Sequence, residues 1–548
     1  MKNIMFKTKA VSFAFVVAVM AFAACTKDAT GGEDVIAPED SVENAQSTLT
    51  TVKLASFAGD ASRVTYAESS RADESEETKT LELVATIANP STQDGVVNGF
   101  VKEDNGGRYL SATSVYYDQS SGTYYATYHM QGNNYSTKQE VETAGLIETF
   151  KIDAAGKPEL ETIYRAENPS ELDFDFNHIY FDDLTEVGYI GGYTGDKTSE
   201  TKRIIVAGHN STPVKSGSGY NTKAIIGKID FEKNELTWVP VLTGDKILDD
   251  NGKSLGDEDA GDVNCVVRKY DYYYLATRKG LAALDAKNNL FAPCKDGNDH
   301  NYFLRTPGSA KFISQPLTTS YFALLYLDKN TPKDLQANDE SPAHIAHLSL
   351  PSASTSCILQ GWDSSKQSPL PNVEDFDTMI DWGDQDAILN NIVPMDGKNV
   401  MVTERNITAV CLGKGGLYLK YPTYYDETVK FSDIKEDDKE GRVGSRPVNG
   451  VFVEEADIVM DGQFSSHNTT DGFIYVANGA CLTILNARTL EKVAEYSAFK
   501  PNEDLASANY VHVVKTNNET NQGAPDRIIT VAYGQAGVKV FKFVPPTK

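Results

Sequence analysis

The hydrophobic and polar positions beyond residue 80 recur in short blocks that are typical of β-strands. Each block has a polar residue before two strand-forming residues, a turn rich in Asp, Asn and Gly, and a second β-branched or aromatic run. A third strand, usually opened by Gly, follows in most blocks. These third strands begin at residues 145, 227, 280, 344, 416, 479 and 537. The pattern predicts seven copies of one β-unit, and apolar stripes at helical spacing are almost absent.

Repeats of this length with Gly-marked turns predict an all-β fold, a seven-bladed β-propeller in which each copy is one four-stranded blade. The alternative is a large β-sandwich or two stacked β domains. A separate strand pattern, Leu81–Ile87, precedes the first copy. We expect it to pair with Val538–Phe543 and close the ring, because this removes an exposed edge. The first strands of the copies are expected at 113–116, 177–180, 263–266, 313–315, 390–393, 456–459 and 511–514.

The chain begins with a segment that has the order of a secretory signal peptide. Lys2, Lys7 and Lys9 precede an almost wholly apolar run over residues 10–24. This run is shorter than the roughly 20 residues that a membrane-spanning helix needs. We therefore expect residues 1–24 to be a signal peptide that is removed.

Phe22-Ala23-Ala24-Cys25 resembles the bacterial lipobox, in which small residues precede a cysteine that is lipidated. The resemblance implies an outer-membrane lipoprotein that is attached through a lipid on Cys25. Thr26-Lys27-Asp28 partly resembles the signal that sends Bacteroidota lipoproteins to the cell surface, which leaves the surface and the periplasmic face open. The alternative is ordinary signal peptidase cleavage that leaves Cys25 as a free thiol.

Residues 25–79 are rich in Ser, Thr, Ala, Glu and Asp. Such a composition buries too little apolar surface to offset the entropy of ordering the chain. We expect a lipidated, flexible acidic linker over 25–79, a disordered N-terminal tether for the propeller domain at 80–548.

Charge and cysteine content exclude two further possibilities. The chain has 51 Lys and Arg against 77 Asp and Glu, a net charge of −26, so nucleic acid is not expected as a partner. Apart from Cys25 there is an odd number of widely scattered cysteines, which predicts no intrachain disulfide. They are Cys265, Cys294, Cys357, Cys411 and Cys481.

The sequence contains few motifs of known catalytic or cofactor chemistry. The sequence has no His-Glu-x-x-His and no phosphate-binding loop, and we expect no cofactor. Asp118–Tyr124 superficially resembles the Asp-box turn of sialidase propellers, but it occurs once and lacks the Ser-x-Asp order, so we expect a plain hairpin turn. The acidic cluster at Asp257, Glu258, Asp259 and Asp262 could hold Ca²⁺, but it lacks the EF-hand spacing, and a solvated acidic loop is the favoured interpretation.

The polar position that opens each copy is the first candidate site. In a propeller the innermost strands surround the central channel, so these side chains would converge at its mouth. His178, Asp457 and His512 could then bind a metal or act in acid–base chemistry. The alternative is that the polar groups bond to neighbouring inner strands and fill the channel. The residues are Ser114, His178, Asn264, Ser314, Asn391, Asp457 and His512, and we predict a ligand site around His178, Asn264, Asn391, Asp457 and His512.

An insertion at residues 363–386 is the second candidate. Trp382 lies there among several aspartates, and Trp362 precedes it. An aromatic face beside carboxylates suits a sugar ring, so Trp382 is predicted to stack on a ligand. The alternative is that the tryptophans fix the loop to the propeller.

The lipobox, the acidic tether and third strands such as "GVKVFKF" together resemble uncharacterised β-propeller lipoproteins of Bacteroidota, and the Gly-led strands are similar to the LVIVD-type repeat. The resemblance implies a non-catalytic protein of the outer membrane that binds a glycan or a protein partner. The alternative is a carbohydrate-active hydrolase or lyase with His and Asp groups at the channel mouth.

Overall fold

Antiparallel β-strands make up nearly all of the regular structure. In the described residues there are 33 strands and a single short 3₁₀ helix, η1 (Ala61–Arg63). None of the helical structure in this part of the chain is long and apolar enough to cross a membrane. The computed structural model describes residues 49–67, 80–90, 109–131, 145–167, 173–183, 202–213, 220–269, 271–286, 291–314, 321–327, 343–350, 356–363, 365–366, 368–369, 400–402, 407–410, 418–419, 448–453, 473–478, 481–486, 492–497, 508–521 and 524–546.

The first two blades are four-stranded meanders in which each strand pairs with the next strand along the chain. Successive side chains of each strand point to opposite faces of the blade. Buried aromatic and branched side chains therefore lie on both faces, where adjacent blades pack. The strands of the first blade are β4 (Tyr109–Asp118), β5 (Thr123–Gln131), β6 (Leu146–Ile152) and β7 (Pro158–Ala166). Those of the second are β8 (Asp173–Asp183), β9 (Lys202–Pro213), β10 (Tyr220–Asp230) and β11 (Glu235–Pro240).

A hairpin, β12 (Leu242–Leu248) and β13 (Ser254–Asp259), leads from the second blade to the third. The third blade is β14 (Val263–Lys269), β15 (Tyr272–Thr277), β16 (Gly280–Asp285), β17 (Ala292–Pro293) and β18 (Phe303–Arg305). The fourth is β19 (Ala310–Ser314), β20 (Tyr321–Leu327) and β21 (Ala343–Ser349), followed by the short pair β22 (Trp362–Asp363) and β23 (Ser368–Pro369).

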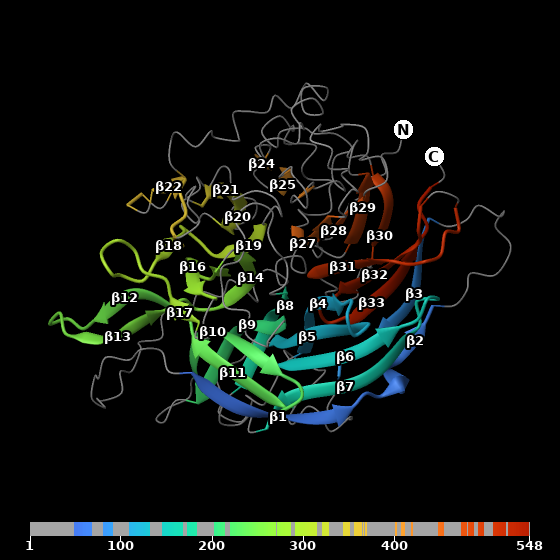
Figure 1. Cartoon of the computed structure of the whole chain (residues 1–548), viewed down its shortest axis with the longest axis horizontal. Coiled ribbons are helices and arrows are strands. Elements are labelled where there is room, and N and C mark those ends of the chain that lie inside the picture. The colour runs from blue at the N-terminus through green and yellow to red at the C-terminus, as the bar shows by residue number, and fades with distance from the viewer. Residues whose placement is uncertain are drawn as a thin grey trace, which may run out of the picture.

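Three further meanders follow, and in Figure 1 the strands β4, β8, β14, β19, β27 and β31 surround a common centre. The described strands therefore form antiparallel meanders around one axis, which is a β-propeller. The count of seven blades stays a prediction, because parts of the fourth and fifth meanders lie outside the described residues. These strands are β24 (Val400–Val402), β25 (Ile407–Val410), β26 (Tyr418–Leu419); β27 (Val448–Val453), β28 (Phe473–Asn478), β29 (Cys481–Asn486), β30 (Lys492–Ser497); and β31 (Tyr510–Lys515), β32 (Arg527–Ala532), β33 (Val538–Phe543).

The N-terminal strand closes the ring as predicted. β3 (Leu81–Ile87) pairs antiparallel with β33, and on its other edge it pairs with β2 (Val64–Tyr66). Figure 1 shows the blue β3 beside the red β33. The last blade is thus completed by a strand from the other end of the described chain, so opening the ring requires breaking this sheet.

The expected flexible linker is wrong in its C-terminal part. Residues 50–58 form β1 (Thr50–Ala58), which runs along the outer edges of two blades. Its first residues pair with β11 and its last with β7, so β1 joins both blades into one nine-stranded sheet. The expectation failed because the pairing partners of β1 lie about a hundred residues or more further on, which local composition does not reveal.

A buried ion pair anchors the segment after β1. Arg63 of η1 contacts the carboxylate of Glu148, and both side chains are buried. The Tyr128 hydroxyl donates to the same carboxylate at 2.7 Å, and Arg63 also donates to the Ala88 carbonyl at 2.8 Å. Because a buried carboxylate without partners is costly, these contacts hold residues 61–63 against the first blade.

Candidate functional site

The inner strands share one local irregularity near their first residues. The register of each inner strand with the second strand shifts there by one residue, in β4, β8, β14, β19 and β27. A β-bulge of this kind turns the extra side chain away from its own ladder. The extra residues are Thr113, Asn177, Asn264, Lys311 and Asn449.

Side chains at these bulges bond to the backbone of the next blade. Thr113 donates to the Phe176 carbonyl at 2.6 Å, and Asn177 donates to the Val263 carbonyl at 3.0 Å. Asn264 donates to the Ala310 carbonyl at 2.7 Å. Asn509, just before β31, donates in the same way to the Ala112 carbonyl at 2.8 Å. One repeated hydrogen bond therefore joins four successive blade junctions.

The residue after the bulge forms a second row of interblade bonds. Ser114 Oγ accepts from the Ile179 amide at 3.0 Å, and His178 Nδ1 accepts from the Val266 amide at 3.1 Å. The Cys265 thiol accepts from the Ile313 amide. Ser114, His178 and Asn264 were predicted to face a ligand. Their side chains instead form hydrogen bonds to the neighbouring blade, as expected if the polar groups fill the channel.

Two of the predicted histidines are held in their neutral form. Burial lowers the pKa of His178 to about 4, and burial lowers that of His512 to about 4 as well. His512 lies on β31 among aromatic rings, with centroids 5.0 Å from Tyr116 and 5.2 Å from Phe452. In the part of the chain that the structure describes, burial is the cause of both shifts and no carboxylate offsets it, so neither imidazole is a useful acid near neutral pH.

The remaining predicted residues are not placed. Asn391, Asp457, Trp382 and Cys25 lie outside the described residues. The expectation that residues 456–459 open the sixth copy is wrong, because its inner strand is β27. Ser314 is the last residue of β19 and does not open that strand. Of the predicted site residues, Ser114, His178, Asn264 and His512 therefore lie on inner strands around the centre.

A buried network of charged and polar side chains lies near the start of β8, and no sequence motif indicates it. His209 of β9 places Nε2 3.1 Å from Asp175 Oδ2 and Nδ1 3.2 Å from Asp262 Oδ1. Asn177 donates to Asp262 at 2.8 Å, and its amide oxygen lies 3.0 Å from His129 Nδ1. Groups from three blades thus meet at one junction. The three charged residues are far apart in sequence, and only the register, which sets Asp175 opposite His209, brings them together.

The carboxylates reverse the effect of burial on His209. Burial alone would lower the pKa of this imidazole, but Asp262 and Asp175 raise it well above the usual value of 6.5. His209 is therefore a cation near neutral pH that links the second and third blades. Across the described part of the chain, no cluster of His, Cys, Asp and Glu side chains has the arrangement of a metal site.

The acidic cluster has partners of its own. Asp257 pairs with Lys246, and Glu258 lies 3.2 Å from Lys279 Nζ and also contacts Arg305. Residues 257–259 belong to β13, so the expected solvated loop is wrong for them. Burial raises the pKa of Asp259 to about 6, although its carboxylate accepts from two backbone amides.

The β12–β13 hairpin also contains the spacing Gly-x-Ser-x-Gly, at residues 252–256. A nucleophile elbow places its Ser on a sharp turn from a strand into a helix. Here Ser254 is the first residue of β13, after the turn of a two-stranded hairpin. The motif therefore does not form the structure that its chemistry needs.

An open hollow lies between the first two blades. Its volume is about 320 Å³. Three aromatic rings lie close together there, with centroid distances of 4.6 Å for Tyr164–Phe231 and 5.4 Å for Tyr125–Phe231. Glu161 supplies a carboxylate, which pairs with Lys151 at 2.8 Å. The lining residues are Thr123, Tyr125, Thr149, Glu161, Thr162, Tyr164 and Phe231.

Strand pairing and the interblade bonds define this chain as a β-propeller. No family model and no curated protein sequence matches it. The β-propeller domain of Myceliophteria thermophila Cps50 (Swd1) is 8% identical, with a TM-score of 0.29, over 81% of this chain and 99% of that chain. Saccharomyces cerevisiae Sqt1 is 9% identical, with a TM-score of 0.31, over 81% and 98%. An extracellular domain of a B. thetaiotaomicron two-component system is 10% identical, with a TM-score of 0.32, over 81% and 42%. At such values the fold assignment rests on the strand pairing and the interblade bonds of this chain.

Proposed function

We propose that this protein is an exported, lipid-anchored β-propeller that binds a glycan without converting it. The observation that carries the proposal is the hollow between the first two blades, where aromatic rings, threonine hydroxyls and a carboxylate line one open space. Aromatic faces pack on the C–H faces of sugar rings, while hydroxyls and carboxylates bond to sugar hydroxyls. Tyr164 and Phe231 are the anchors, and Glu161 is the polar contact.

The open shape of the hollow favours an extended ligand. An enclosed pocket suits a small molecule that is surrounded on all sides. An open space between two blades instead accommodates a few units of a long polymer. The edge strand β1 lies across both blades that form the hollow, which holds their relative position fixed.

Binding is tested with a panel of soluble polysaccharides in affinity electrophoresis, followed by titration calorimetry. Loss of one good contact costs about 1 kcal/mol, so the double variant Tyr164→Ala/Phe231→Ala loses about 2 kcal/mol and should bind about thirtyfold more weakly. Tyr66→Ala is the matched control, since Tyr66 is an exposed tyrosine that does not line the hollow. Unchanged affinity in the double variant would reject the hollow as the site.

The second location is the channel mouth, around His178, Asn264, Asn391, Asp457 and His512, with Trp382 stacking from the insertion. Trp382→Ala distinguishes the two locations. Weaker binding in this variant, with normal binding in the Tyr164→Ala/Phe231→Ala variant, would move the site there. Binding of a protein partner with no polysaccharide bound would contradict glycan recognition.

The catalytic alternative is a hydrolase or lyase acting at the channel mouth. It draws no support from the described histidines, because His178 is buried and its Nδ1 accepts a backbone amide. The release of reducing ends from each bound polysaccharide tests it directly. A time-dependent release that is abolished in a His178→Ala/His512→Ala variant would replace binding by catalysis.

Export and anchoring rest on the leader at residues 1–24 and on Cys25. Replacing Cys25 by Ala should move the protein from the membrane fraction to the soluble fraction. Mass spectrometry of the membrane-bound wild type should find a lipid on Cys25. An unlipidated Cys25 in that fraction would contradict the anchor and leave glycan binding untouched.

A further inference from the structure

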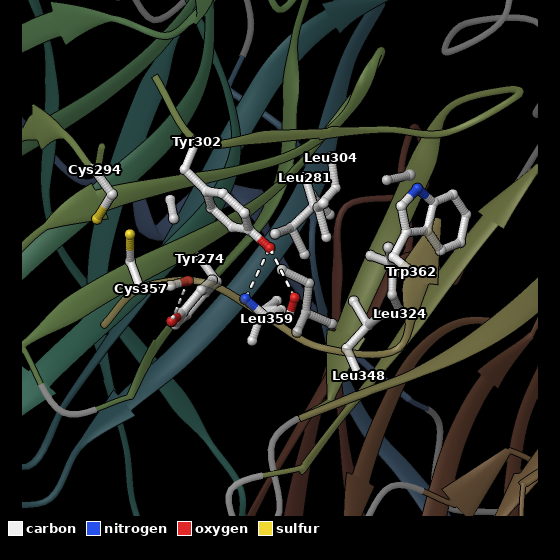
Figure 2. Packing of buried hydrophobic residues seen from close by; sticks show 14 of the residues in the cluster. Tyr274, Leu281, Cys294, Tyr302, Leu304, Leu324, Leu348, Cys357, Leu359 and Trp362 are labelled. Carbon is white, nitrogen blue, oxygen red and sulfur yellow. Dashed lines mark hydrogen bonds between the residues drawn. The ribbon is translucent and has the colours of Figure 1, made fainter. Parts of the chain in front are cut away.

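Two thiols meet on the outer side of the third blade. Cys294 follows β17, and Cys357 belongs to the segment 356–359 that follows the fourth blade. Figure 2 shows the two sulfur atoms pointing toward each other. Both residues are buried in the same apolar cluster, together with Tyr274 and Tyr302.

The backbones on both sides are fixed by hydrogen bonds. The Cys294 amide donates to the Ala283 carbonyl at 3.0 Å, and its carbonyl accepts from the Tyr302 amide at 2.7 Å. The Tyr274 hydroxyl donates to the Cys357 carbonyl at 3.0 Å. The Tyr302 hydroxyl accepts from the amide of Leu359 at 2.8 Å, which holds the segment against the blade (Figure 2). The fold itself therefore sets the distance between the two thiols.

The thiols also interact directly. Cys294 and Cys357 share a side-chain hydrogen bond, and Cys357 Sγ lies 3.8 Å from the carbonyl oxygen of Lys295. The hydrogen bond lowers the pKa of Cys357 and raises that of Cys294. Cys357 is thus the thiol that ionises first and attacks a disulfide more readily.

We infer that Cys294 and Cys357 form an intrachain disulfide that ties the segment after the fourth blade to the third blade. Facing sulfurs on fixed backbones are what a disulfide requires, and scattered positions in sequence do not report them. The inference replaces the expectation of no intrachain disulfide. It rests on the proposed export in one respect, since disulfides persist in oxidising compartments.

The reaction needs an external disulfide as the oxidant, either an oxidised thiol–disulfide oxidoreductase or a small disulfide. The Cys357 thiolate attacks one sulfur of the oxidant, whose S–S bond breaks and releases one thiolate. Cys294 then loses its proton and attacks Cys357 Sγ in the mixed disulfide, which releases the second thiolate. Two cysteine thiols are oxidised, one disulfide is reduced to two thiols, and the two protons pass to the released groups.

The expected consequence is a covalent loop around the fourth blade. The chain between residues 294 and 357 contains β18, β19, β20 and β21. Cross-linking its ends limits the freedom of the unfolded chain, so the fourth blade should resist local unfolding. Trypsin should therefore cut the oxidised protein after Lys311 of β19, inside this loop, more slowly than the reduced protein.

The test uses the purified full-length protein, denatured, reduced and refolded in a buffer of reduced and oxidised glutathione. Free thiols are blocked, and the protein is digested with trypsin without reduction. Mass spectrometry should find peptide 288–295 linked to peptide 334–366. Cys294→Ser and Cys357→Ser should each lose this linked pair and leave the other cysteine open to blocking.

Cys265 and Cys481 provide the matched controls, because they are also buried but come from other parts of the fold. Cys265→Ala and Cys481→Ala should keep the linked peptides. Finding Cys294 and Cys357 both blocked after refolding, or linked to other cysteines, would overturn the inference. The linked pair after refolding but free thiols in the native membrane fraction would contradict export and leave the pairing intact.

Discussion

His178 and His209 lie on neighbouring strands of one blade, and both are largely buried. Their pKa values are nevertheless shifted in opposite directions. His178 accepts a hydrogen bond from the Val266 amide, and its ring centroid lies 5.5 Å from that of Tyr510. Burial lowers the pKa of His178 to about 4. His209 lies between two carboxylates, which raise its pKa well above 6.5. Burial alone removes the charge, whereas burial between carboxylates preserves it.

The blades are joined in two ways. Around the channel, neutral donors and acceptors bond to the backbone of the next blade, and the same bond recurs at successive junctions. Between the second and third blades, one cation also bridges two anions. The stability of the first kind of junction should change little with salt or with pH near neutrality. The stability of the second kind depends on the charge of one residue.

The largest effect should come from removing the His209 cation. His209→Ala leaves Asp175 and Asp262 close together without their shared partner, so the free energy of unfolding should fall by about 3 kcal/mol. Chemical denaturation at neutral pH measures it. The contribution of His209 is full below its unfolded pKa of about 6.5 and is lost as the pH rises through the higher folded pKa. The destabilisation by His209→Ala should therefore shrink at alkaline pH.

His300 is the control for this variant. It pairs with Asp296 at 3.7 Å on the surface, and its side chain is 77% exposed. Exposed pairs contribute little, so His300→Ala should change stability by less than about 0.5 kcal/mol. Equal losses in His209→Ala and His300→Ala would remove the distinction between a buried bridge and a surface pair.

His178 should make the protein less stable at acidic pH, which is opposite to the pH dependence of His209. His178 has a folded pKa below its unfolded value, so its full stability is present above pH 6.5 and is lost as the pH falls toward about 4. The loss from this residue should reach about 3 kcal/mol. His178→Asn keeps an acceptor for the Val266 amide without a titrating group. The variant should therefore lose less stability than the wild type between these two pH values, and parallel pH profiles would contradict the buried neutral imidazole.

The smallest effect concerns one bond of the repeated ring. Asn264→Ala leaves the Ala310 carbonyl without its donor and should cost about 1 kcal/mol, with no change in pH dependence. Asn251→Ala, in the exposed turn between β12 and β13, should be neutral within about 0.5 kcal/mol. A pH-dependent loss in Asn264→Ala would show that the ring bonds are coupled to a titrating group.

Much of the fold was predictable because blades are local. Strand–turn–strand blocks and Gly-led third strands lie within short stretches of sequence, and the pairing of Leu81–Ile87 with Val538–Phe543 followed from the need to cover an edge. The sixth inner strand was predicted too late in the chain. The Val-Asn pair at 448–449 matches the one at 263–264, and this bulge signal locates β27 correctly.

The sites were less predictable because they depend on register between blades. Asp175, His209 and Asp262 have no common motif, and Cys294 and Cys357 meet only after the chain has completed another blade. Tyr125, Tyr164 and Phe231 each resemble ordinary strand or turn residues until two blades are placed side by side. Sequence spacing describes a blade well, but it does not describe the contacts between blades.

The most direct test of these two kinds of junction is an NMR titration of the protein with isotope-labelled histidine, with His178→Asn and His209→Ala used to assign the imidazole signals. At a pH about midway between 4 and 6.5, we expect a neutral His178 with its proton on Nε2 and a doubly protonated His209. A protonated His178 or a neutral His209 at that pH would contradict this expectation.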